Sequence, residues 1–524
     1  MEKNSLVEYG SRRVIIVVTA ILCALLEIVD TTIVNVALND MKGNLGATLS
    51  EVGWVITAYA IGNVIIIPMT SWLSQQFGRR NYFAASVILF TICSFLCGNA
   101  TTMWELILFR FLQGVGGGAL LVTSQTIITE VFPLEKRGMA QALYGMGVII
   151  GPTLGPPLGG YLVENYSWPY IFYINIPVGI VAAILALQYV RNPPYAGLKK
   201  KVSEVDWWGI LFLMAAVGCL QFVLERGQES DWFNDKTILT LTIVSAVSIY
   251  LFIWRELTCK NPIVNLRVLK DGNLRIGVVL TFVLGFGLYG STFIIPLYLQ
   301  SSLGWSAYQA GLIMTPAALM SAFMMPLIGQ LIQRGVKQQY IAATGFLMFF
   351  IYSLWGYHIL TPDTSKDDFF WLLMFRGFGL SMLFIPITTL SLSTLKGREI
   401  GEGASFTGMM RQLGGSFGVA LITTFISHQN AMHRSDMLPH ISADNIVFQQ
   451  RFESTVGMFM GKGFAPNVAT QMAYASMEGN IMKQVAVLSY MDVFLTIGIV
   501  FLLSIPFILL AKSSKGKVDM SNAH

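Results

Sequence analysis

The chain alternates long apolar runs with short polar segments, and this pattern predicts a helical membrane protein. A spanning helix needs about 20 mostly apolar residues, and counting such runs predicts about fourteen helices. These lie at 14–38, 51–72, 83–99, 105–129, 139–163, 170–190, 208–225, 237–256, 275–299, 308–331, 340–360, 369–393, 405–428 and 488–511. Only 12% of the residues are charged, whereas a soluble domain has about 25%. The predicted fold class is an all-α polytopic membrane protein.

Lysine and arginine gather in every second loop between these runs. The alternate short loops are poorer in basic residues and often acidic, whereas the basic loops lie at 79–80, 136–137, 199–201, 255–275, 334–337 and 396–398. By the positive-inside rule the basic loops face the cytoplasm, which predicts that both termini are cytoplasmic. The net charge of +5 then follows from topology and does not indicate nucleic-acid binding.

The segment 429–487, between the last two predicted helices, is too long for an ordinary loop. The predicted topology places it outside the membrane, opposite the basic loops. Phe448, Phe452 and Val456 are spaced to form a stripe on a helix. The segment is interpreted either as a docking surface for a partner or as an amphipathic cap on the lipid headgroups.

Charged residues interrupt the predicted helices and are candidates for function, because charges inside a membrane are costly. Glu27 and Asp30 are about one turn apart in the first helix and can face the same cavity. Asp30 and Arg110 are expected at similar depths, which predicts an ion pair. The pair is interpreted either as a structural link or as a proton-coupling site, because the pKa of such a carboxylate depends strongly on its surroundings. Glu27 has no basic neighbour in sequence, and Arg411 is interpreted as structural.

Small residues recur at every fourth position of the predicted fifth helix, at Gly147, Gly151, Gly155 and Gly159. On a helix they form one bare ridge, which allows another helix to approach closely. The same stretch contains helix-bending prolines at Pro152, Pro156 and Pro157. A ridge alone indicates a tight helix crossing, and its combination with the prolines favours a hinge or gate.

These features together resemble the major facilitator superfamily, and within it the fourteen-helix drug:proton antiporters, the EmrB-like multidrug efflux pumps. The matching stretches are 30–38, Arg110 with 113–114 and 116–118, 155–156, 159–160, Trp168, 172–179, 206–209, 231–233, 261–262 and 411–415. The loop 71–80 departs from the superfamily pattern, with Gln75 where an acidic residue is usual. This departure argues against a cytoplasmic charge-relay latch at that loop.

The resemblance implies two six-helix bundles, at 14–192 and 261–512, an inserted helix pair at 193–260, and cytoplasmic ends at 1–13 and 513–524. The bundles would rock around a site near the bilayer midplane. The ridge would lie at the bundle interface, in a gating motif of Gly147, Gly151, Pro152, Gly155, Pro156, Gly159 and Gly160. Pumps of this type work in the bacterial inner membrane with a periplasmic EmrA-like adaptor and an outer-membrane channel, and segment 429–487 would contact the adaptor.

The expected activity is export of amphipathic drugs or toxic compounds in exchange for protons, which would bind Asp30, Glu27 or both, with Arg110 as partner. The chain has no G-x-x-x-x-G-K-[ST] loop, so a proton gradient rather than ATP is the expected energy source. No cofactor and no metal are expected. The candidate substrate contacts are Glu27, Asn35, Tyr59, Phe286, Tyr289, Phe293 and Tyr298.

Three alternatives remain open from the sequence. The same fold can export one specific metabolite, fatty acid or siderophore. A membrane sensor or scaffold without transport is a second alternative, and the costly intramembrane charges count against it. A membrane enzyme is a third, and it is disfavoured because the chain has no H-E-x-x-H motif and no grouping of a nucleophile with a base.

Overall fold

The regular structure of the described residues is helical throughout. The computed structural model describes residues 6–194, 205–259, 261–362, 364–441 and 445–511. In these ranges, 13 helices are long and apolar enough to cross a membrane. One more long helix, described below, packs among them. The predicted fold class, an all-α polytopic membrane protein with about fourteen spanning helices, is confirmed.

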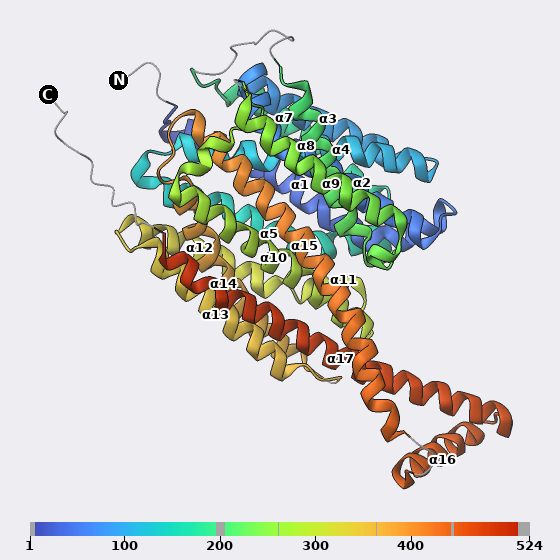
Figure 1. The fold of residues 1–524 in the computed structure, drawn as a ribbon. Coiled ribbons are helices and arrows are strands. Elements are labelled where there is room, and N and C mark those ends of the chain that lie inside the picture. The colour runs from blue at the N-terminus through green and yellow to red at the C-terminus, as the bar shows by residue number, and fades with distance from the viewer. Residues whose placement is uncertain (1–5, 195–204, 260, 363, 442–444, 512–524) are drawn as a thin grey trace.

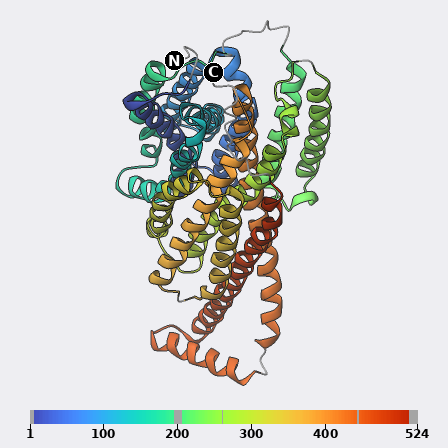
Figure 2. The same ribbon diagram turned by 90° about the vertical axis from the view of Figure 1, so that its left-hand side faces the viewer.

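The helices pack as two bundles with a helix pair beside them (Figures 1 and 2). The first bundle contains α1 (Gly10–Asn44), α2 (Leu49–Phe77), α3 (Arg79–Gly98), α4 (Met103–Val131), α5 (Arg137–Asn165), α6 (Tyr170–Tyr173) and α7 (Asn175–Tyr189). The pair is α8 (Trp207–Arg226) and α9 (Lys236–Thr258). The second bundle contains α10 (Gly272–Ser301), α11 (Ala307–Leu312), α12 (Thr315–Gln333), α13 (Gln338–Ile359), α14 (Lys366–Leu392), α15 (Arg398–Met437) and α17 (Pro466–Leu509).

Helix α15 is the long helix that the apolar count leaves out, because charged, polar and glycine residues lower its hydropathy. It is nevertheless mostly buried from Ile400 to Ile422. It packs against α2 and α4 of the first bundle and against α10 and α17 of the second. Polar residues are tolerated at membrane depth where protein rather than lipid surrounds them. We therefore interpret α15 as a spanning helix that runs along the boundary between the bundles.

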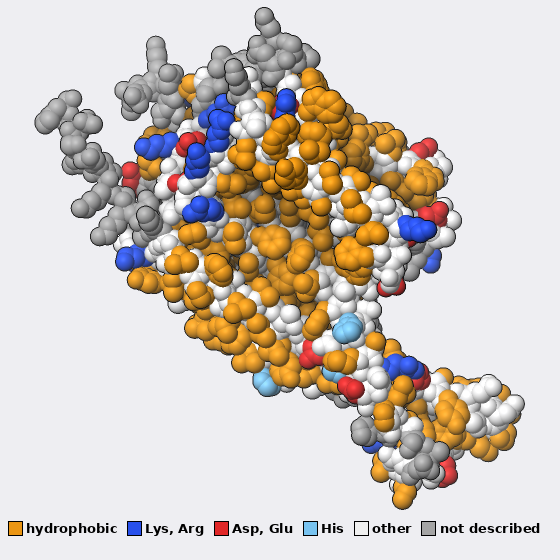
Figure 3. Space-filling view, viewed as in Figure 1, with side chains coloured by type: hydrophobic (Ala, Val, Ile, Leu, Met, Phe, Trp, Pro, Cys, Tyr) orange, Lys and Arg blue, Asp and Glu red, His pale blue; other side chains and the backbone are white. Residues whose placement is uncertain are grey.

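Helix α1 begins and α17 ends at the same end of the molecule, on the left in Figure 1. Most of the Lys and Arg side chains visible in Figure 3 gather at that end. Apolar side chains cover much of the face between this end and the opposite one. The arrangement of basic residues agrees with the topology that the loops predict.

Segment 429–487 is mostly helical in its described residues, which are 429–441 and 445–487, and we call it the stalk. It comprises the ends of α15 and α17 and the short helix α16 (Ile446–Gly461), and it projects from the bundles at the end opposite the start of α1 (Figures 1 and 2). Phe448 stacks on Phe452, whose ring centre lies 4.4 Å from that of Tyr474. Phe452, in the middle of the predicted stripe, therefore holds α16 against α17.

The glycine ridge of α5 does not lie at the bundle interface, which corrects the expectation from the sequence. A Cβ atom at Gly151 or Gly155 would collide with side chains of Ile28 or Thr32 on α1, a helix of the same bundle. Both flanking members of the ridge, Gly147 and Gly159, also face α1. The spacing of four residues showed that a helix approaches closely, but it carried no information about which helix.

Other positions of α5 form the contact with the second bundle. A Cβ at Gly138 would lie 3.3 Å from the backbone oxygen of Gly329 on α12. Near the other end of α5, a Cβ at Gly160 would lie 3.3 Å from Cα of Tyr308 on α11. One helix therefore touches α1 with its ridge and the second bundle with a different face.

Gly145 and Gly147 provide a matched test of this assignment. A Cβ at Gly145 would lie 2.7 Å from the buried ring of Phe384 on α14, whereas a Cβ at Gly147 would meet Ile21 at 3.6 Å, an ordinary contact. We expect Gly145→Ala to cost about 1–3 kcal/mol by overpacking. Gly147→Ala should be neutral or stabilising, because alanine is favoured over glycine in helices. Melting temperatures in detergent measure the difference, and equal values would contradict the assignment.

Candidate functional site

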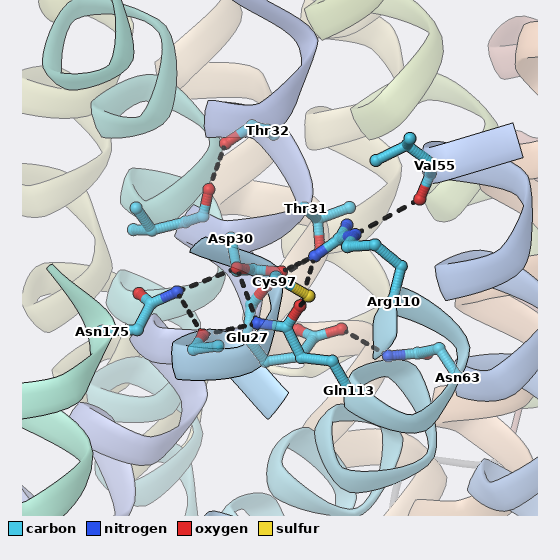
Figure 4. A network of polar contacts seen from close by, with 12 residues as sticks. Glu27, Asp30, Thr31, Thr32, Val55, Asn63, Cys97, Arg110, Gln113 and Asn175 are labelled. Atoms are coloured by element: carbon cyan, nitrogen blue, oxygen red, sulfur yellow. Dashed lines mark hydrogen bonds and ion pairs between the residues drawn. The ribbon is translucent and has the colours of Figure 1, made fainter. Parts of the chain in front are cut away.

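Asp30 and Arg110 form an ion pair inside the first bundle, as the sequence predicted (Figure 4). Arg110 Nη1 lies 2.5 Å from Asp30 Oδ2, and the two side chains are 1% and 0% exposed. Arg110 Nε also donates to the carbonyl oxygen of Val55 at 3.2 Å. The Tyr59 ring covers the guanidinium, with its centre 4.1 Å from Cζ. The pair is thus sealed between α1, α2 and α4.

Neutral polar residues complete the shell around the Asp30 carboxylate. Oδ1 of Asp30 accepts from Gln113 Nε2 at 3.0 Å and from Asn175 Nδ2 at 2.8 Å. Gln113 and Asn175 both also donate to Ser94 Oγ (Figure 4). Hydrogen bonds of this kind stabilise the ionised carboxylate. In the sequence analysis, Gln113 and Asn175 appear only within stretches that match the family. Their polar side chains inside apolar helices could have identified them as partners of Asp30.

Glu27 lies one turn from Asp30 and has a different set of neighbours. It is 3% exposed, and its Oε1 accepts from Asn63 Nδ2 on α2 at 2.8 Å. It also interacts electrostatically with Arg411 of α15, in the second bundle. Sequence reasoning found no basic neighbour for Glu27, because Arg411 is more than 380 residues away along the chain.

Arg411 lies between the two bundles and is 2% exposed. Its Nη2 donates to the hydroxyl of Tyr144 on α5 at 3.1 Å. The rings of Tyr144 and Phe384 lie 5.9 and 5.7 Å from its Cζ. Tyr289, one of the predicted substrate contacts, packs against Gly415 of α15, about one turn from Arg411. Residues of opposite charge from opposite bundles therefore share one region, which we call the central seam: Glu27, Asn63, Tyr144, Tyr289, Phe384 and Arg411.

Tyr59 lies beside Glu27, since a Cβ at Gly117 would meet both side chains, whereas the remaining predicted substrate contacts lie elsewhere. Tyr298 is buried in the second bundle and donates to the carbonyl oxygen of Thr361 at 2.6 Å. Phe286 packs against Gly418 of α15 within the same bundle. Phe293 is half-buried against the hydrophobic core, and Asn35 is exposed on α1. Substrate contact by these four residues stays a prediction.

Arg376 of α14 is a second arginine buried within a single bundle. Its Nε donates to Ser291 Oγ at 2.8 Å, and its Nη2 donates to Thr292 Oγ1 at 2.5 Å and to the carbonyl oxygen of Leu288 at 3.3 Å. These three acceptors belong to α10 and are uncharged. Arg376 therefore binds α14 to α10 through neutral groups.

Polar contacts are also present at the basic end of the molecule. Arg79 forms an ion pair with Glu130 of α4, and Gln75 donates to Ser71 Oγ at 3.2 Å. Arg137, at the start of α5, donates to the carbonyl oxygens of Leu392 and Leu395, at 3.2 and 3.3 Å. This last contact joins the two bundles at the end of α14. It was not predicted, because nothing in the sequence indicates which helix end an arginine will cap.

A family model described as the Major Facilitator Superfamily matches residues 20–419. The chain belongs to this superfamily. The fatty acid resistance protein FarB of Neisseria gonorrhoeae is 33% identical over 492 residues, 94% of each chain. The multidrug export protein EmrB of Escherichia coli K12 is 32% identical over 509 residues, 97% of each chain. The sequence-based resemblance is therefore confirmed.

Structural comparison supports the same assignment at the level of the fold. The solved structure of the proton:xylose symporter XylE superposes with a TM-score of 0.61 at 16% identity, covering 97% of each chain. Together with the sequence relatives, this likeness identifies a multi-pass bacterial membrane protein that is an efflux transporter of the major facilitator superfamily. The expectation of a transporter rather than an enzyme is confirmed at this level.

The Asp30–Arg110 pair provides a stability test that is independent of transport. Arg110→Ala leaves a buried carboxylate without its cation, which should cost about 3–5 kcal/mol. The double variant Asp30→Asn/Arg110→Gln replaces the ions with neutral amides and should recover much of that loss. Melting temperatures of the single variants Asp30→Asn and Arg110→Gln and of the double variant complete the double-mutant cycle. Additive losses in the double variant would show that the two residues are not energetically coupled.

Proposed function

We propose that this transporter exports amphipathic compounds in exchange for protons by alternating access. The observation that carries the proposal is the buried Asp30–Arg110 ion pair. A structural link between helices can use neutral groups, as Arg376 does, whereas a carboxylate can also take up a proton. Protonation of Asp30 would cancel the charge that holds Arg110 and would change the packing of α1 against α4.

Helix α5 offers a route from this pair to the bundle interface. Its ridge contacts the α1 segment that includes Ile28 and Thr32, on either side of Asp30. Its other face reaches Phe384 and Tyr308 of the second bundle. A shift of α1 would therefore be transmitted to α5 through these close contacts, in which Ile28 and Thr32 of α1 pack against the glycine positions. The gating motif would in this way carry a movement of α1 to the bundle interface, although its glycine ridge lies inside the first bundle.

The central seam is the proposed substrate site. Glu27 would attract cationic amphipaths, and the aromatic rings around Arg411 would contact their apolar parts. The proposed setting is the bacterial inner membrane, with both termini and the basic end in the cytoplasm. The driving force would be the proton gradient, without a cofactor.

The stalk is the proposed contact for a periplasmic EmrA-like adaptor that leads to an outer-membrane channel. Its described residues include exposed apolar side chains, among them Ile446 and Val447 at 69% and 61% exposure. An exposed apolar surface on a projecting element is typical of a protein contact. The placement of the stalk opposite the basic end supports a partner on the outer side.

A second candidate function is export of fatty acids or another defined metabolite. The name of the fatty acid resistance protein FarB, at 33% identity over 94% of this chain, favours it. It requires the same fold and the same coupling, and differs only in what the central seam binds.

Proton coupling can be tested with inverted membrane vesicles and a cationic dye. We expect uptake driven by a proton gradient in the parent, and loss of most of this uptake in Asp30→Asn, because an amide cannot exchange a proton. Asp40→Asn is the matched control, since Asp40 is exposed near the end of the same helix. Uptake retained in a folded Asp30→Asn would assign the proton site elsewhere, with Glu27 next.

The stalk can be tested by replacing Ile446 and Val447 with serine. Both residues are exposed on α16, so the change should leave folding and vesicle uptake intact. We expect drug resistance of whole cells, together with co-purification of an adaptor, to decrease. If resistance and vesicle uptake both stay at parental levels, the exposed face of α16 is not the adaptor contact.

A further inference from the structure

The guanidinium of Arg411 is only partly satisfied in this structure. Nη2 donates to Tyr144, whereas Nη1 is buried and has no hydrogen-bond partner among the described residues. No ion pair joins Arg411 to a carboxylate in the described part of the chain. A buried, unsatisfied donor on a charged group is costly.

Two other arginines buried in the described bundle cores, Arg110 and Arg376, show how a well-bonded guanidinium is accommodated here. Arg110 has a carboxylate, an amide oxygen and a backbone carbonyl as acceptors. Arg376 has two hydroxyls and a carbonyl. Arg110 makes these contacts within the first bundle, and Arg376 makes its contacts within the second. Arg411 differs in position as well as in partners, because it lies where the bundles meet.

The neighbours of Arg411 would separate if the bundles parted. Tyr144 belongs to the first bundle and Phe384 to the second, and their ring centres lie 6.1 Å apart beside the guanidinium. Moving α5 away from α14 and α15 would remove the Tyr144 hydroxyl and expose the fork of Arg411. The exposed group would be a cation bordered by aromatic rings.

We propose that Arg411 binds the anionic group of amphipathic substrates, such as a carboxylate or a sulfonate. This inference rests on the alternating access of the proposed function and specifies its substrate class. A guanidinium offers two parallel donors, which match the oxygens of such an anion. The aromatic rings accommodate the apolar tail. Because Glu27 lies in the same seam on the opposite bundle, one site accepts amphipaths of either charge, each at the residue of opposite sign.

Two fluorescent probes with the same alkyl tail test the proposal, one ending in a sulfonate and the other in a trimethylammonium. The sulfonate stays ionised and does not cross the bilayer by itself. Transport of both is measured in proteoliposomes under a proton gradient. For Arg411→Gln we expect the ratio of sulfonate to ammonium transport to fall about tenfold or more, as loss of hydrogen bonds to a charged group predicts. For Glu27→Gln the ratio should rise.

Two further variants separate recognition from folding. Arg411→Lys keeps the charge and removes the fork, so it should lower the ratio less than Arg411→Gln. Tyr144→Phe removes the acceptor of Nη2 and leaves the guanidinium in place, so the ratio should not fall. An unchanged ratio in both Arg411 variants would overturn the proposal, and so would a parent that transports only the ammonium probe under the gradient. In the latter case the proposed antiport would still stand.

Binding measured without a gradient distinguishes the two proposals if transport fails. Fluorescence of the sulfonate probe is titrated against the detergent-solubilised parent and Arg411→Lys. Tighter binding by the parent supports Arg411 as the anion site even where no proton-driven transport is seen. Equal binding, or none by either protein, overturns it.

Discussion

A charge buried in an apolar membrane protein needs a partner, and in this chain the pairing of Asp30 with Arg110 satisfies that need. The carboxylate of Asp30 accepts hydrogen bonds from α4 and α7, and the guanidinium of Arg110 donates hydrogen bonds to α1 and α2. Four helices are thereby tied to one point. The same constraint makes the pair responsive, because a change in the charge of either member alters what the surrounding helices must satisfy.

Helix α5 connects this point to the rest of the molecule. Its glycines allow backbone-close contact with α1 on one face and with the second bundle on another. The glycine positions let side chains of α1 pack directly against the α5 backbone, which holds the two helices together by close packing. Tyr144, on the same helix, reaches Arg411 across the seam. The first bundle, the bundle interface and the central seam therefore share one structural element.

Much of the fold could be predicted from sequence, because apolar runs and basic loops report directly on membrane topology. The Asp30–Arg110 pair was also predictable, since its two residues are costly wherever helices place them in a membrane. The partner of the glycine ridge was not, because its spacing gives a helix face without naming the helix that packs there. Arg411 was underestimated for a related reason. Its distance from Glu27 along the chain concealed that packing brings the two charges near each other.

The buried charge of Arg376 has no anionic partner among its hydrogen-bond acceptors, unlike the charge of Arg110 in the first bundle. Its acceptors are hydroxyl and carbonyl groups, which do not titrate under physiological conditions, so the second bundle carries a permanent positive charge in its core. A permanent charge that moves in the membrane field and returns within each cycle does no net work. If the carrier alternates between two orientations as proposed, the membrane voltage would bias which orientation the empty carrier adopts, and the energy of each cycle would have to come from charges that are exchanged with the surroundings.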